Sequence, residues 1–137
     1  MKKNQIDFEL NAIIEKDSHF ITDLELCQLR LIDNVDFPWV VLIPRLDNIV
    51  EITDLDNVQY GMLNNETRMI ARVMQKAFIP DKLNLATIGN VVEQLHIHII
   101  ARYRNDKLFP KPVWGHKLIN YTEEKLLETI VLIKNTL

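Results

Sequence analysis

The chain contains a single cysteine, Cys27, among its 137 residues. One thiol cannot form an internal disulfide, and a zinc site built from cysteines is excluded. We therefore expect a protein of the reducing cytoplasm in which Cys27 is a small apolar core residue. The first residues, Met1 to Gln5, are polar and charged, so they do not predict a signal peptide.

The sequence also has no basic excess and no apolar run long enough to cross a membrane. Its net charge is −3, whereas a protein that binds a nucleic-acid backbone needs a positively charged surface. We expect neither a nucleic-acid partner nor a membrane partner. Repeats and linkers are missing, and 47% of the residues are hydrophobic, which is enough for the core of one domain over residues 1–137.

Hydrophobic periodicity predicts short strands on both sides of one long helix. Apolar residues recur every three or four positions from Leu55 to Phe78, with Asp54 as the expected N-cap. A last helix is expected after Thr122, where two glutamates favour a helix start. This order of elements predicts an antiparallel α+β domain. The other expected elements are a short helix at 8–16 and strands at 18–22, 26–32, 39–43, 83–88 and 95–103.

Residues 94–100 carry the most functional information in the sequence. Polar and apolar residues alternate there, which predicts a strand with Gln94, His96 and His98 on one face. Side chains two positions apart on a strand lie roughly 6 to 7 Å apart, so two imidazoles and an amide can converge on one small anionic group. The pattern alone leaves three interpretations: histidines without a function, a pair of metal ligands, or phosphate chemistry.

Several stretches resemble the histidine-triad (HIT) superfamily. Residues 94–100 are similar to its signature His-φ-His-φ-His-φ-φ, where φ is apolar, with glutamine in place of the first histidine. Residues 84–92 resemble the segment that leads into the signature, and 31–34 with 39–45 resemble an acidic turn and an apolar strand. The chain looks most like a bacterial subgroup with a downstream Pro-Val-Trp-Gly, here 112–115. The resemblance implies a HIT-like fold: a five-stranded antiparallel sheet, one long helix and a C-terminal helix, usually assembled as a homodimer.

The resemblance also implies roles for individual residues. His96 matches the histidine that attacks the α-phosphate of a nucleotide, and His98 matches one that hydrogen-bonds the phosphate oxygens. Gln94 takes the place of the third catalytic residue, but an amide cannot carry a proton at neutral pH. Glutamine is sufficient if this position only orients, whereas a weak enzyme is expected if it relays protons. The resemblance implies four further site residues: Gly89 and Asn90 beside the phosphate, and Asn84 and Asp33 beside the ribose. Asparagine and aspartate also stabilise turns without a ligand, which is the alternative for Asn90, Asn84 and Asp33.

The implied activity is hydrolysis of a nucleoside phosphoramidate or a dinucleoside polyphosphate through a nucleotidyl-histidine intermediate. A purine nucleotide is the implied small-molecule partner, and aliphatic residues within 29–32 could form the wall of its base pocket. The resemblance implies no cofactor and no protein-bound metal, although Mg²⁺ can accompany a polyphosphate substrate.

Two other classes of function stay open. A degenerate family member would bind nucleotides as a sensor without turnover. A metalloprotein would use the two histidines of the signature with a third ligand such as His19, His116 or a carboxylate. The segment Phe109–Trp114 is expected to be either a lid or dimer contact, or a loop that covers the core.

Overall fold

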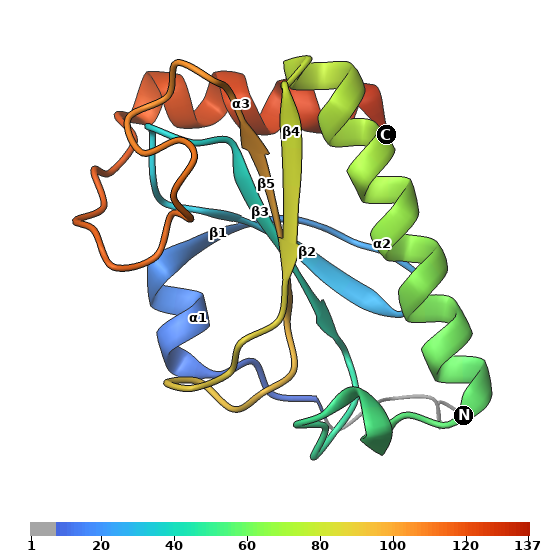
Figure 1. Ribbon diagram of the computed structural model, residues 1–137. Coiled ribbons are helices and arrows are strands. Elements are labelled where there is room, and N and C mark those ends of the chain that lie inside the picture. The colour runs from blue at the N-terminus through green and yellow to red at the C-terminus, as the bar shows by residue number, and fades with distance from the viewer. Residues whose placement is uncertain (1–7) are drawn as a thin grey trace.

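The computed structural model describes residues 8–137 and confirms the α+β class, with one five-stranded antiparallel sheet and three α-helices in that range (Figure 1). The strands are ordered β1-β2-β3-β5-β4, and every neighbouring pair is antiparallel. A short 3₁₀-helix lies between β3 and α2 at Ile52–Asp54. The elements are α1 (Ala12–Asp17), β1 (Ser18–Asp23), β2 (Cys27–Ile32), β3 (Trp39–Pro44), α2 (Asn57–Phe78), β4 (Lys82–Ala86), β5 (Ile97–Arg102) and α3 (Glu123–Thr136).

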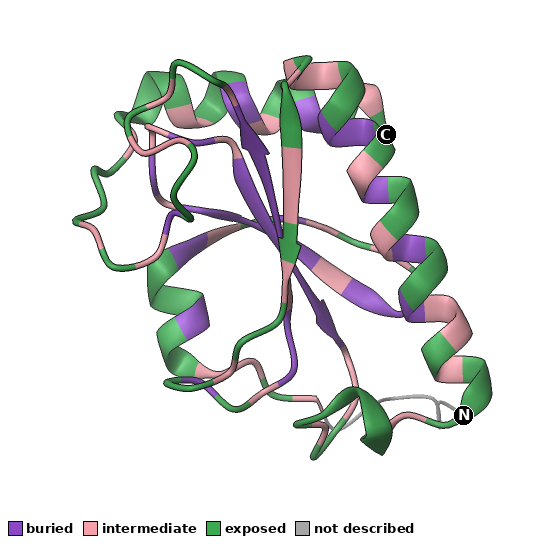
Figure 2. Ribbon diagram, in the orientation of Figure 1, coloured by how far each residue is buried: buried purple, intermediate pink, exposed green. Residues whose placement is uncertain are grey.

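Both faces of the central strands are covered. Helices α2 and α3 pack on one face in the larger apolar cluster, whereas α1 and the loop after β5 pack on the other face (Figure 1). Strand β3 is buried at every position (Figure 2), which explains its uninterrupted apolar sequence. His98 pairs with Val41 across the β3–β5 register, so it lies on the face that α1 covers.

Two helices begin later than the sequence predicts, because side-chain caps fix their first residues. The first helix begins at Ala12, since the side chain of Asn11 accepts a hydrogen bond of 2.8 Å from the amide of Ile13. The long helix is capped by Asp56 and not by Asp54. Asp54 instead belongs to the preceding 3₁₀-helix, where its carboxylate accepts main-chain N–H groups.

The segment before β5 also differs from the prediction. The strand begins at Ile97, so Gln94 and His96 lie in the loop that connects β4 to β5. Gly89 adopts a φ of 72° in this loop, a conformation that favours glycine. Alternation of side chains between two sheet faces therefore holds for His98 but does not place Gln94.

A buried ion pair organises the loop after β5. Arg102, only 1% exposed, contacts both carboxylate oxygens of Asp106 at 2.8 and 3.0 Å. The same carboxylate accepts hydrogen bonds from three main-chain N–H groups of the loop. Because Asp106 ties this loop to the end of β5, it fixes where the chain continues towards Trp114.

Candidate functional site

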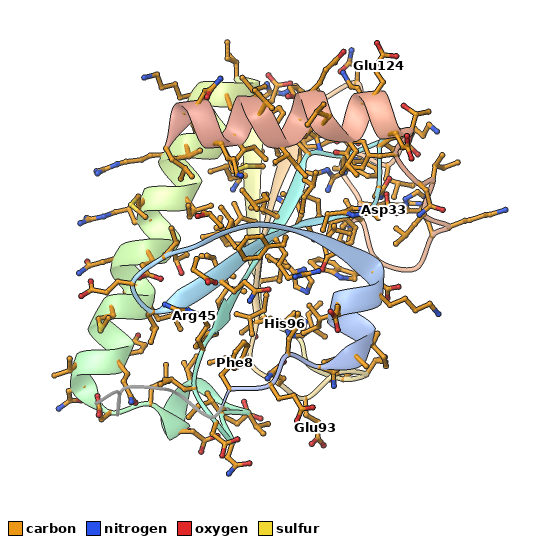
Figure 3. All side chains as sticks on the ribbon, turned by 180° about the vertical axis from the view of Figure 1, so that it is seen from behind. Phe8, Asp33, Arg45, Glu93, His96 and Glu124 are labelled. Carbon is orange, nitrogen blue, oxygen red and sulfur yellow. The ribbon has the colours of Figure 1, made fainter. Side chains whose placement is uncertain are left out.

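A cavity of about 260 Å³ lies on the α1 side of the sheet, and both histidines of the signature line it. Its volume is slightly below the roughly 300–1,000 Å³ typical of ligand pockets. Figure 3 shows His96 in the interior, beside the segment that leads into α1. The lining residues are Ile13, Asp17, Ile32, Trp39, Ile88, Gly89, Asn90, Val91, Val92, His96, His98, Trp114 and Leu118.

His96 is held in one tautomer by a main-chain oxygen. Its Nδ1 lies 2.6 Å from the carbonyl oxygen of Gln94. A carbonyl oxygen only accepts hydrogen bonds, so Nδ1 carries the proton and donates it. The second ring nitrogen, Nε2, therefore keeps its lone pair. His96 is buried, and a neutral imidazole with a free Nε2 can act as a nucleophile.

His98 is held in the opposite tautomer by the indole of Trp39. The indole Nε1 lies 2.9 Å from Nδ1 of His98 and can only donate, so Nδ1 of His98 accepts and its Nε2 carries the proton. Burial, with a smaller contribution from His96, lowers the pKa of His98 to about 3. His98 is therefore a neutral hydrogen-bond donor at physiological pH.

Aromatic rings pack around the two histidines. The ring of Trp114 lies 5.2 Å from that of His98 and 5.6 Å from that of Trp39, both edge to face. The two imidazoles are themselves 4.8 Å apart. Sequence reasoning missed Trp39 as a site residue, although its place at the start of the strand next to β5 was a usable signal. In the segment 109–114, Val113 is buried in the core and Trp114 lines the cavity; a role as a lid or dimer contact stays a prediction.

Two of the four further expected site residues, Gly89 and Asn90, line the same cavity as the histidines. They come from the loop between β4 and β5, whereas Ile13 and Asp17 of α1 provide another part of the lining. The prediction that Gly89 and Asn90 lie close to the histidines is therefore in agreement with the structure. Both residues are near the signature in the chain.

Gln94 does not line this cavity. Its side-chain oxygen accepts a hydrogen bond of 2.8 Å from the main-chain N–H of Asn11. Its side-chain nitrogen donates one of 3.0 Å to the main-chain carbonyl oxygen of Glu9. The main chain of Gln94 thus supports His96, while its side chain binds the segment that precedes α1.

Asp33 and Asn84 lie elsewhere as well. The carboxylate of Asp33 accepts hydrogen bonds from the side chain of Asn120 and the amide of Tyr121, at 2.8 and 2.9 Å. In Figure 3 Asp33 lies apart from His96, towards the start of α3. The side-chain oxygen of Asn84 accepts from the buried Arg102 at 2.9 Å. Both side chains therefore have structural partners, and the carboxylate that lines the cavity is that of Asp17.

The remaining histidines are separate from the signature. His19 lies 3.4 Å from Asp33, and His116 packs edge to face on Phe37. Within residues 8–137, no group of three or more His, Cys, Asp or Glu side chains is arranged to hold a metal ion. Over the same range no helix has the length and apolar character required to span a bilayer.

Comparisons with known proteins agree with this geometry. The HIT domain family model matches residues 14–105. A histidine triad protein from Sinorhizobium meliloti is 36% identical, with 96% of this chain and 98% of that chain covered and a TM-score of 0.93. One from Marinobacter aquaeolei is 37% identical, with coverages of 95% and 96% and a TM-score of 0.92.

A more distant structure shares only the fold. Plasmodium falciparum diadenosine triphosphate hydrolase is 20% identical, with 95% of this chain and 82% of that chain covered and a TM-score of 0.67. A search among curated proteins gave no match. The family match spans most of the chain, and two structures more than 30% identical cover nearly all of it; the chain therefore belongs to the HIT domain family.

Proposed function

We propose that this protein hydrolyses a nucleoside phosphoramidate, with His96 as the nucleophile that attacks the α-phosphate. The observation that carries the proposal is the pair of opposite tautomers, a free Nε2 on His96 beside an N–H donor on His98. A nucleophile needs a lone pair, and the charge that develops on phosphate oxygens needs a donor. Membership of the HIT family supports a nucleotide-related function.

The reaction proceeds in two displacements. Nε2 of His96 forms a bond to phosphorus while the P–N bond breaks, and the leaving amine takes a proton from solvent. The Nε2–H of His98 donates to a phosphate oxygen and offsets the charge that builds up there. Water then attacks phosphorus and loses a proton to solvent, the P–Nε2 bond breaks, and a nucleoside monophosphate leaves with His96 regenerated.

The residues that line the cavity are consistent with a substrate that carries a nucleoside on its phosphate. Ile13, Ile32 and Leu118 are among the aliphatic side chains that line it, and flat apolar rings pack well against such surfaces. Asp17 contributes the carboxylate among the lining residues, so we assign to it the ribose hydroxyls that the sequence analysis gave to Asp33. A carboxylate can accept hydrogen bonds from two vicinal hydroxyls.

The charge of the cavity favours the phosphoramidate over a dinucleoside polyphosphate. Its lining, taken over residues 8–137, includes one aspartate and no lysine or arginine. A polyphosphate leaving group carries several negative charges and needs cations to balance them, whereas an amine leaving group does not. The diadenosine triphosphate hydrolase with the same fold makes dinucleoside polyphosphates the competing substrate class.

The proposal is tested by incubating the protein with adenosine phosphoramidate and, separately, with diadenosine tetraphosphate plus Mg²⁺. Release of AMP is measured for the protein and for His96→Ala. We expect turnover of the phosphoramidate at least tenfold above that of the dinucleotide (on the order of 1.4 kcal/mol), and none by the variant.

A covalent adduct gives a second readout. Acid quenching during turnover, followed by intact-mass analysis, should show the mass of one AMP on the wild-type protein and not on His96→Ala. Nucleotide binding without turnover or adduct would overturn the proposal in favour of a nucleotide sensor.

A further inference from the structure

The side chain of Gln94 contacts main-chain atoms on both sides of Leu10. It accepts from the amide of Asn11 and donates to the carbonyl oxygen of Glu9. A carboxamide offers an acceptor and a donor side by side, as a peptide group does. A carboxylate could only accept, and the two nitrogens of an imidazole point in different directions. Glutamine therefore fits this position for a reason unrelated to proton transfer.

The segment that Gln94 binds leads directly into α1. The main-chain N–H of Asn11 donates the hydrogen bond to Gln94. The side chain of the same asparagine caps the helix. Two residues of this helix, Ile13 and Asp17, line the cavity above the histidines. The contact thus connects the first position of the signature, through the main chain of residues 11–13, to the part of the cavity wall that α1 provides.

The position of α1 depends on contacts at its two ends. The helix has only six residues, well below the length at which an isolated helix is stable. At its C-terminal end, the guanidinium of Arg30 donates to the carbonyl oxygens of Glu15 and Ser18, at 3.3 and 2.9 Å. At its N-terminal end, Gln94 provides the two hydrogen bonds described above. Ile14 anchors the middle of the helix in the core.

We propose that Gln94 is a positioning residue that holds α1 as the nucleoside-binding wall of the cavity. The inference rests on the proposed function for the identity of the ligand. Gln94 then contributes to the binding of the nucleoside and not to the chemical step. Gln94 lines the hollow that adjoins this cavity at Asn90, but both polar atoms of its side chain are bound to main-chain groups. The proton relay that a histidine would provide requires contact with the leaving group instead.

The kinetic test compares Gln94→Ala, Gln94→His and wild type on adenosine phosphoramidate. Loss of two hydrogen bonds, one partly buried and one exposed, should raise KM by roughly fivefold to thirtyfold, with kcat changed less than about twofold. Gln94→His, which restores the full histidine triad, should also raise KM and give no gain in kcat. Gln75→Ala, the same truncation at an exposed site on α2, should behave as wild type.

A second readout needs no substrate and separates this inference from the proposed function. Amide hydrogen exchange in α1 should accelerate by roughly fivefold to thirtyfold in Gln94→Ala, because the same two hydrogen bonds are lost, and should not change in Gln75→Ala. Gln94→Glu keeps the acceptor and loses the donor, so its exchange rates should be intermediate.

Two outcomes would overturn the inference. A higher kcat in Gln94→His would show that this position relays protons. Unchanged exchange in α1 of Gln94→Ala would show that the side chain does not hold the helix. If the protein turns over no phosphoramidate, the exchange measurement still decides the positioning role, and the proposed function fails separately.

Discussion

The indole N–H of Trp39 donates a hydrogen bond of 2.9 Å to Nδ1 of His98. This contact joins the first residue of β3 to the second residue of β5, and it forces the proton of His98 onto Nε2. The neighbouring His96 is fixed in the other tautomer by a main-chain carbonyl. Two histidines separated by one residue thus become chemically different through their different hydrogen-bond partners.

Replacing Trp39 with phenylalanine should therefore impair the chemical step. Without the indole donor, Nδ1 of His98 can take the proton, and the pKa of His98 should rise from about 3. We expect kcat for the phosphoramidate to fall by roughly tenfold to a hundredfold, the loss expected for one hydrogen-bond donor to developing charge. Nitrogen-15 NMR of the imidazoles as a function of pH reports both the tautomer and the pKa.

Trp114→Phe is the matched control for this experiment. Its ring packs on His98 at 5.2 Å, but its indole nitrogen makes no hydrogen bond to that histidine in the described structure. The tautomer of His98 should stay the same in this variant. A wild-type tautomer in Trp39→Phe would contradict the role of the indole.

The low pKa of His98 also makes the stability of the protein depend on pH. Between pH 6.5 and about 3, the unfolded chain binds a proton at this residue and the folded chain does not. The free energy of unfolding should therefore decrease as the pH falls through this window, by at most about 1.4 kcal/mol per pH unit. Urea titrations of wild type and His98→Gln measure the effect, because the other ionisable groups are common to both. Parallel curves for the two proteins would contradict the prediction.

The Arg102–Asp106 pair should be essential for folding stability. Burial by itself would raise the pKa of Asp106, but hydrogen bonds from Arg102 and three main-chain N–H groups hold that pKa well below its usual range. Asp106→Asn would leave the buried guanidinium without a counter-charge, at a cost of about 3–5 kcal/mol. Chemical denaturation should show this loss.

The control for this prediction is Glu128→Gln. Glu128 pairs with Lys125 on the surface, where both side chains are more than half exposed, so its loss should cost less than about 1 kcal/mol. An equal effect of the two substitutions would show that burial does not determine the contribution of the Arg102 pair.

Asp17 and Asp33 should respond differently to the same change. Asp17→Asn should raise KM for the ribonucleoside substrate by about tenfold and for its 2′,3′-dideoxy analogue much less, because it removes a charged acceptor of the ribose hydroxyls. Asp33→Asn should mainly lower stability, since the carboxylate of Asp33 holds the segment before α3. The reverse pattern would return the ribose contact to Asp33.

The sequence predicted the positions of residues near the signature more accurately than the positions of residues far from it in the chain. The strict alternation predicted β5 and the inward direction of His98, and the continuous apolar run at 39–43 predicted the fully buried β3. Alternation failed at Gln94 because the strand begins only at Ile97. The two aspartates are both far from the signature in the chain. Asp33 was predicted by resemblance and does not line the cavity, whereas Asp17 was not predicted and lines it because α1 folds over the sheet.

Hydrophobic periodicity and local spacing act within a few residues, so the α+β class and the two histidines on one short segment can be predicted without a structure. The tautomers of those histidines, the partner of Gln94 and the walls of the cavity are instead set by the folded structure. Each depends on contacts between distant segments, such as Trp39 with His98 and Gln94 with Asn11. Such contacts form only when the strands pair in one register, and no local pattern specifies which distant side chains will then meet.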